Sequence, residues 1–129
     1  MAKLRYHPGF DRGRRGVIYL EDGTSFDVLA ELAEVSEKYP DKLDKLEDLL
    51  ELLQRDGKIH NNKQCRDIKG CKGLLELKAN PCRLYWHWHL NCICLVLAVV
   101  EGKKRQEADA RQACKRKEVA QGITEITED

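Results

Sequence analysis

GLLELKANPCRLYWHWHLNCICLVLAVVEGKKR, residues 73–105, carries the strongest structural signal in this sequence. β-branched and aromatic residues that alternate with polar ones are typical of strands. The pattern predicts three antiparallel strands over residues 73–78, 82–89 and 92–100, with turns at 79–81 and 90–91. Because the third run is almost wholly apolar, we expect it in the centre of the sheet.

Upstream of this meander, a helical hairpin is predicted from about Ser25 to Asp56. Thr24 or Ser25 can cap its first helix, since a side-chain hydroxyl accepts a free backbone N–H. Pro40 suits the first turn of the second helix, where its missing N–H costs nothing. The second helix has an apolar stripe at helical spacing, made of Leu43, Leu46, Leu49, Leu50 and Leu53. Such a hairpin needs a sheet face to cover.

The remaining segments complete an expected α+β domain over residues 17–122. Residues 1–16 are basic and glycine-containing, and we predict a flexible basic arm there. Residues 17–20 are expected to form a short strand, and residues 106–120 a C-terminal helix. Residues 123–129 form an acidic tail, in which Ile123 and Ile126 are candidates for a short strand. The predicted architecture is thus an N-terminal helical hairpin packed on a small antiparallel sheet, followed by a C-terminal helix.

Composition and charge narrow the functional classes. The sequence has no apolar run long enough for a membrane helix and no signal-peptide core at its start, so a cytoplasmic location is expected. In that compartment we expect all six cysteines to be free thiols. Residues 58–122 contain 14 Lys and Arg against 6 Asp and Glu, a net charge of +8. Nucleic acid is the natural partner for such a half.

The strand 82–89 places chemically active side chains on one face. Arg83, Tyr85, His87 and His89 share that face, and we expect it to be exposed to solvent. The other face carries Leu84 and two tryptophans, and we expect Trp86 and Trp88 to belong to the core. A two-residue turn at 90–91 pairs His89 with Cys92, His87 with Cys94, Tyr85 with Val96 and Arg83 with Ala98.

The resulting His/Cys cluster allows three interpretations. It has the donors of a zinc site, but the spacing H-x-H-x₂-C-x-C is not that of a zinc finger. The side chains are also compatible with plain packing at the end of the sheet, with cysteines acting as small apolar groups. The third interpretation is a catalytic surface lined by Arg83 and one histidine.

The order of elements, together with ELK, CRLYW and EGKKR at the strand ends, resembles the RelE/ParE/HigB superfamily of toxins, in particular its phage and HigB-like branch. The resemblance covers roughly residues 17–121. Members come from bacterial and phage toxin-antitoxin modules. They are ribosome-dependent mRNA endonucleases or, in the ParE branch, gyrase poisons, and a co-expressed antitoxin neutralises them. The resemblance therefore implies a RelE-like fold, an antitoxin partner and mRNA on the ribosome as substrate.

The same resemblance suggests roles for individual residues. Arg83 matches the arginine of an R-L-x-Y-type strand, and its planar fork suits a phosphate and transition-state clamp. Lys78 matches the basic residue that closes the preceding strand. Either Lys104 or Arg105 matches the catalytic arginine of a basic cluster after the central strand. Three further lysines are expected to bind RNA: Lys69, Lys72 and Lys103.

One departure from the family pattern opens alternatives. Many active members have a Tyr or His after the basic cluster, whereas residues 107–129 contain neither. His87 is then the best candidate for a general base, since histidine titrates nearest to neutral pH. We expect no cofactor, no metal and no membrane partner. The alternative functions are a non-catalytic member, either a gyrase poison or an antitoxin-binding protein, and a zinc- or nucleic-acid-binding module.

Overall fold

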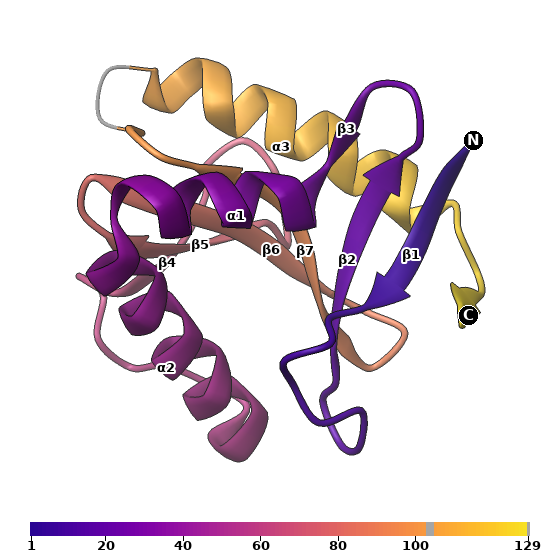
Figure 1. Cartoon of the computed structure of the whole chain (residues 1–129), viewed down its shortest axis with the longest axis horizontal. Helices are drawn as coiled ribbons and strands as arrows, with labels where there is room; N and C mark the ends of the chain where they lie inside the picture. Colours follow the sequence, from indigo (N-terminus) through magenta and orange to yellow (C-terminus); the bar gives the residue numbers. More distant parts are fainter. Residues whose placement is uncertain (103–104, 129) are drawn as a thin grey trace.

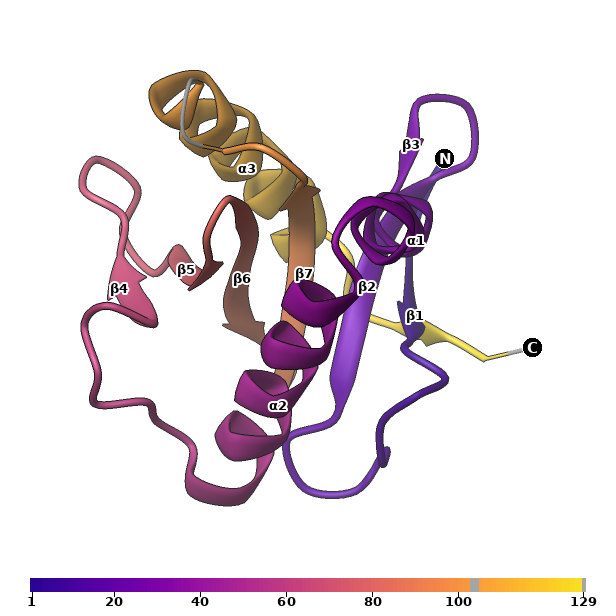
Figure 2. The same ribbon diagram turned by 60° about the vertical axis from the view of Figure 1, so that its left-hand side comes forward.

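A computed structural model of the protein describes residues 1–102 and 105–128. Its elements in chain order are β1 (Ala2–Tyr6), β2 (Val17–Asp22), β3 (Phe26–Asp27), α1 (Val28–Lys38), α2 (Pro40–Asp56), β4 (Cys65–Asp67), β5 (Leu75–Ala79), β6 (Cys82–His89), β7 (Cys92–Val99), α3 (Gln106–Gln121) and β8 (Ile126–Thr127). Figures 1 and 2 show one twisted sheet with α1 and α2 on one face and α3 on the other.

The sheet corrects the predicted architecture. The described residues form an eight-stranded sheet in the order β4-β5-β6-β7-β2-β1-β8, with β3 attached to β2. It is mixed, because β2 runs parallel to β7 and β8 runs parallel to β1. The prediction of a RelE-like helical hairpin on a small antiparallel sheet is therefore wrong. The parallel pairs join segments that are far apart in the sequence, and local patterns give no sign of such pairing.

Within this sheet, the predicted meander is present. β5, β6 and β7 pair as consecutive antiparallel strands. β7 lies between β6 and β2, so the expected central position of the apolar run is confirmed. Leu90 and Asn91 form the turn between β6 and β7 with φ angles of 53° and 63°. Both values lie in the left-handed region that a two-residue hairpin turn of type I′ requires.

The helices begin and end for local reasons. The carboxylate of Asp27 accepts the backbone N–H of Leu29 at 2.9 Å and caps α1, so the prediction of Thr24 or Ser25 as the cap is wrong. Pro40 occupies the first turn of α2 as predicted. Gly57 has a φ of 74°, and its N–H bonds to the carbonyl of Leu53 at the end of α2.

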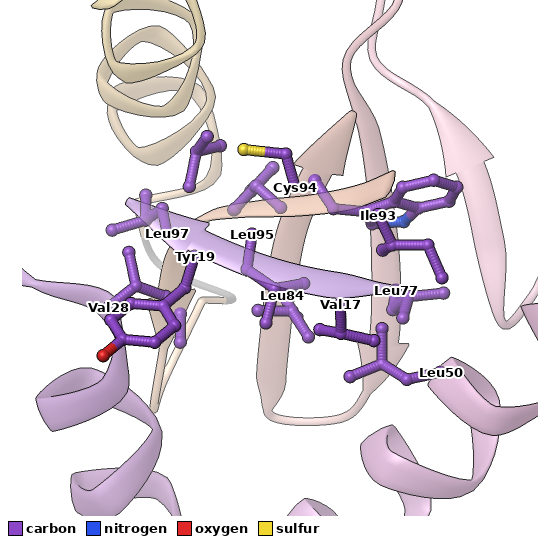
Figure 3. Packing of buried hydrophobic residues seen from close by; sticks show 14 of the residues in the cluster. Val17, Tyr19, Val28, Leu50, Leu77, Leu84, Ile93, Cys94, Leu95 and Leu97 are labelled. Carbon is purple, nitrogen blue, oxygen red and sulfur yellow. The ribbon is translucent and has the colours of Figure 1, made fainter. Parts of the chain in front are cut away.

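The core fills the space between the sheet and the helical hairpin. Figure 3 shows Leu50 of α2 packed below Leu77, Leu84 and Val17 of the sheet. The core side chains that are at most 4 % exposed include Leu46, Leu50, Leu53, Trp86, Leu95 and Leu97. Trp88 was, like Trp86, predicted to belong to the core. This prediction is wrong, because 41 % of its surface is exposed.

The N-terminal segment is integrated into the fold. β1 pairs with β2 along its whole length, within the residues for which a flexible arm was expected. Arg15 donates to the carbonyls of Gln54 and Arg55 at 2.8 and 3.1 Å, at the carbonyl end of α2 where a cation is favourable. Gln54 in turn donates to the carbonyls of Asp11 and Arg15. These bonds fasten residues 11–15 to α2.

A disulfide links the loop after β4 to α3. Cys71 and Cys114 are bonded, with their Cα atoms 6.1 Å apart. The prediction of six free thiols is therefore wrong for this pair. The other cysteines among the described residues are free and buried: Cys65, Cys82, Cys92 and Cys94. In the same part of the chain, every helix is too short or too polar to cross a membrane.

Candidate functional site

Helix α3 covers the face of β6 that was expected to be exposed to solvent. Tyr85, His87 and Arg83 on this face are between 0 and 7 % exposed. α3 can approach β6 and β7 closely because it turns Ala113 and Ala120 toward them, both fully buried. The basic run Lys115–Lys117 of α3 is largely buried as well, since only Lys115 of the three is exposed. The sequence pattern of α3 is only weakly amphipathic, so it does not show which face of the helix is buried.

A buried ion-pair cluster lies beneath the first turns of α3. The sheet register sets Arg66 of β4 opposite Glu76 of β5, and Glu76 opposite Tyr85 of β6. Directly opposed residues point to the same face, so the three side chains meet. Arg66 and Arg83 each donate to the same carboxylate oxygen of Glu76 at 2.9 Å. Glu76 is fully buried, so its charge is neutralised by these two arginines.

Several polar atoms in this cluster have no hydrogen-bond partner. Within the described ranges they are Glu76 Oε2, Arg83 Nε, Tyr85 OH and Asp109 Oδ2. Burial, and after it the charge of Glu76, raises the pKa of the Tyr85 hydroxyl. Burial also raises the pKa of Asp109 on α3, although Arg105 and Arg83 act in the opposite direction. Buried polar groups without a hydrogen-bond partner are rare in native proteins, and a functional role is one explanation for them.

Gly102 makes room for Arg83. A Cβ atom at position 102 would lie 2.5 Å from Cδ of Arg83, which no ordinary packing permits. The backbone N–H of Gly102 donates to the carbonyl of Pro81 at 2.9 Å and holds the turn over the arginine. The glycine of the EGKKR motif thus serves the burial of Arg83.

The cluster reaches the surface at Arg66, whose side chain is 40 % exposed. There it meets a groove between the loop that follows β4 and the outer side of α3, which we call the α3 groove. Two adjoining hollows form it, and both are lined by Ile68 and Lys69 from the loop and by Glu107 and Ala110 from the helix. One hollow also contains Arg66, and the other contains the Cys71–Cys114 disulfide.

The histidines of β6 lie apart from this cluster. The predicted pairs of His87 with Cys94 and of His89 with Cys92 are confirmed. Burial, and next the charge of His89, lowers the pKa of His87 to about 4. His87 Nδ1 lies 3.2 Å from the carbonyl of Trp88, while its Nε2 is buried without a partner in the described part of the chain. His87 is thus enclosed in the interior, and it does not line the hollows beside α3.

The other two predicted pairs of this ladder are wrong. A β-bulge after Tyr85 shifts the register, so Tyr85 lies opposite Leu97 and Arg83 opposite Val99 instead of Val96 and Ala98. Among residues 1–102 and 105–128, no three His, Cys, Asp or Glu side chains come together as a metal site. The interpretation of the His/Cys cluster that the geometry favours is packing.

The structure thus gathers only part of the predicted site. Arg83 lies opposite Lys78 across the β5–β6 ladder, and Arg105 immediately precedes α3, beside Asp109. His87 is four positions along the strand from Arg83, about 13 Å away. Lys69 lies in the α3 groove, and Lys72 is exposed in the same loop. Lys103 and Lys104 lie outside the described residues.

Sequence reasoning missed three members of the cluster: Glu76, Arg66 and Asp109. Glu76 did leave a signal, because it is a single charge between leucines in a strand of the most basic part of the chain. A carboxylate in such a position is stable only with buried cationic partners. No such signal marks Arg66 and Asp109, since each stands in a polar stretch.

Comparison with known proteins gave no relative. A scan of the sequence against protein-family models found no match, and searches of the curated proteins and of the solved structures found none either. We therefore infer the function from the chemistry of the residues.

Proposed function

We propose that this protein binds single-stranded RNA in the α3 groove. The observation that carries the proposal is the charge of the groove and its rim. Of the described residues, the cationic ones that line the groove are Arg66, Lys69, Arg111 and Lys115, and the acidic ones are Asp67, Glu107 and Glu118. Lys72 and Arg105 are exposed and each stands next in the sequence to a lining residue, Cys71 and Gln106. A groove with an excess of cations attracts phosphates, because binding releases the counterions of the nucleic acid.

The buried cluster supports this role by holding one of the cations in place. The Nε–H of Arg66 donates to Glu76, and this bond anchors the side chain. The other N–H groups of its guanidinium stay available to a ligand in the groove. An anchored arginine loses little side-chain freedom on binding a phosphate, so its planar fork is ready for two parallel hydrogen bonds. The disulfide has a similar effect, since it fixes the loop that carries Lys69 against α3.

RNA titration by fluorescence anisotropy tests the proposal. We expect Lys69→Glu and Arg111→Glu each to weaken binding about 10-fold at moderate salt. Each lost phosphate contact also reduces the dependence of log affinity on log salt by about 0.7. Lys45→Glu is the matched control, because Lys45 is an exposed lysine of α2 on the opposite face of the sheet. Equal affinities for all three variants and the wild type contradict the proposal.

A second candidate is the activity that the toxin resemblance implies, namely ribosome-dependent cleavage of mRNA in the cytoplasm, controlled by a cognate antitoxin. The unpartnered atoms beside the two arginines favour it. In such a reaction Glu76 takes the proton of a 2′-hydroxyl as that oxygen attacks the phosphorus. Arg83 and Arg66 then stabilise the charge on the phosphorane, and Tyr85 donates its proton to the departing 5′-oxygen. Because Glu76 is fully buried, the ribosome-bound RNA must displace Arg66 before this step.

Tyr85→Phe tests the second candidate with a minimal change. This substitution removes one buried hydroxyl and keeps the aromatic ring in the core, so the fold is retained, while cleavage of translated mRNA falls at least about 10²-fold. Tyr39→Phe is the control, because the hydroxyl of Tyr39 lies at the surface and bonds to Glu101. A wild-type protein that neither slows growth nor cleaves translated mRNA excludes the activity and leaves RNA binding to be judged by the titration.

A further inference from the structure

The α3 groove continues into two more hollows along the surface. The first lies between the end of α2 and the open edge of the sheet and shares Asn62, Arg66 and Asp67 with the groove. The second lies at the N-terminal segment and shares Trp88 with the first. The shared residues place the hollows next to one another, in an order that runs from α3, past β4, to the loop that joins β1 and β2. Figure 2 shows α3 at the upper left, β4 at the left and the loop between β1 and β2 at the bottom.

Trp88 stands at the junction of the last two hollows. Its indole is 41 % exposed and packs edge to face against buried Trp86, with the ring centroids 5.2 Å apart and an angle of 84°. This contact fixes the orientation of an aromatic ring that faces solvent. An exposed, fixed aromatic ring beside cations is the usual platform on which proteins stack a nucleic-acid base.

Cations flank Trp88 on both sides. Lys58 lines the hollow toward the α3 groove, and Arg14 lines the hollow at the N-terminal segment. Arg12 and Arg15 in the same segment have other roles, since Arg12 stacks on Tyr6 and pairs with Glu128, while Arg15 bonds to the end of α2. No carboxylate in the described part of the chain pairs with Arg14.

We infer that the RNA strand bound in the α3 groove continues along this path, stacks a base on Trp88 and places the adjoining phosphates on Arg14 and Lys58. The inference rests on the proposed RNA binding and adds a second contact point to it. Its consequence is a dependence on strand length. A short strand occupies the α3 groove alone, whereas a longer one also reaches Trp88.

Oligouridylates of about 4 and about 12 nucleotides separate the two contact points. We expect Trp88→Leu to weaken binding of the long strand about 10-fold and to leave the short strand unchanged. Arg14→Ala should have the same selectivity with a smaller effect, and Val119→Ala, which changes an exposed side chain of α3, should have no effect. The long strand should also quench the fluorescence of the wild type, and Trp88→Leu should lose that quenching because its remaining Trp86 is buried.

The outcomes distinguish this inference from the function on which it rests. If the long strand binds to Trp88→Leu and Arg14→Ala as it does to the wild type, the extended path is wrong while the groove remains. The same conclusion follows if long and short strands bind equally well and neither quenches the fluorescence. If the wild type binds neither strand, both the groove and the path are wrong.

Discussion

Arg83 illustrates how burial changes what a residue does. As an exposed strand arginine it would be free to clamp a phosphate, and its removal would cost little stability. In the structure it is 7 % exposed, and its guanidinium bonds to fully buried Glu76. Removing Arg83 leaves the buried charge of Glu76 with the partly exposed Arg66 as its partner. Arg83 therefore contributes to stability first and to any chemistry second.

Arg83→Ala should lower the free energy of unfolding by about 2–3 kcal/mol, because it removes the buried ion-pair partner of Glu76 and leaves Arg66 as the remaining one in the described residues. Arg55→Ala is the control, since Arg55 is exposed and its ion pair contributes little. Urea denaturation followed by circular dichroism measures both, and equal midpoints for Arg83→Ala and the wild type are the contrary result.

The buried imidazole of His87 should make stability depend on pH. Its pKa in the folded protein is about 4, below the ordinary value of 6.5, so the unfolded chain takes up the proton first as the pH falls. The contribution of the neutral ring is fully present above pH 6.5 and is lost between pH 6.5 and 4, by about 3 kcal/mol. Unfolding experiments at a series of pH values should show a shallower decline for His87→Gln than for the wild type. Parallel curves for the two proteins contradict the assignment.

At the scale of elements, an ion pair joins α1 to α3 through the sheet. β2 pairs with β7 only at residues 93–95, so the backbone groups that follow on β7 need other partners. Glu31 of α1 accepts the N–H of Ala98, and Arg116 of α3 donates to the carbonyl of Val96. The two side chains also bond to each other at 2.9 Å. A pair of side chains thus supplies partners to β7 beyond the point where its pairing with β2 ends.

Arg116→Ala should destabilise the protein by about 3 kcal/mol, because it leaves the carbonyl of Val96 and the carboxylate of Glu31 without their partner. The stacking of Arg116 on Phe26, 3.6 Å from the ring centroid, is lost as well. Lys115→Ala, one position earlier on the exposed side of α3, should stay within about 0.5 kcal/mol of the wild type. Chemical denaturation measures both, and equal effects of the two substitutions contradict the role of Arg116.

At the scale of the whole molecule, the Cys71–Cys114 disulfide links the loop at the edge of the sheet to α3. It joins residues separated by 43 positions and fixes the loop that forms one wall of the α3 groove. Such a crosslink stabilises mainly by restricting the unfolded chain. The fold beneath it has its own core, so the reduced protein should remain folded.

Reduction should lower the stability by about 2–4 kcal/mol, and the melting temperature by about 10 °C. Cys71→Ser should melt near the temperature of the reduced wild type and should not respond to reductant. Thermal unfolding with and without reductant checks this expectation. A wild type whose melting temperature is unaffected by reductant is the contrary result.

The local signals in the sequence determined the elements of the meander and of the helical hairpin. Alternation placed β6 at residues 82–89, the apolar run placed β7 in the centre of the sheet, and Leu90 and Asn91 formed the predicted turn. These features depend on residues that are close in the sequence, so their pattern carries the information. The basic character of the half that forms the candidate groove could be read in the same way.

Only the tertiary structure determined what each face of the sheet contacts. The parallel pairing of β2 with β7, the covering of Arg83 and His87 by α3, and the bond between Cys71 and Cys114 all join segments distant in sequence. Such contacts form because folding buries apolar area and pairs buried charges wherever the whole chain permits, and no local pattern encodes that choice. Arginine on a strand is the same residue in either environment, and the helix that packs over it decides whether it meets RNA or a buried glutamate.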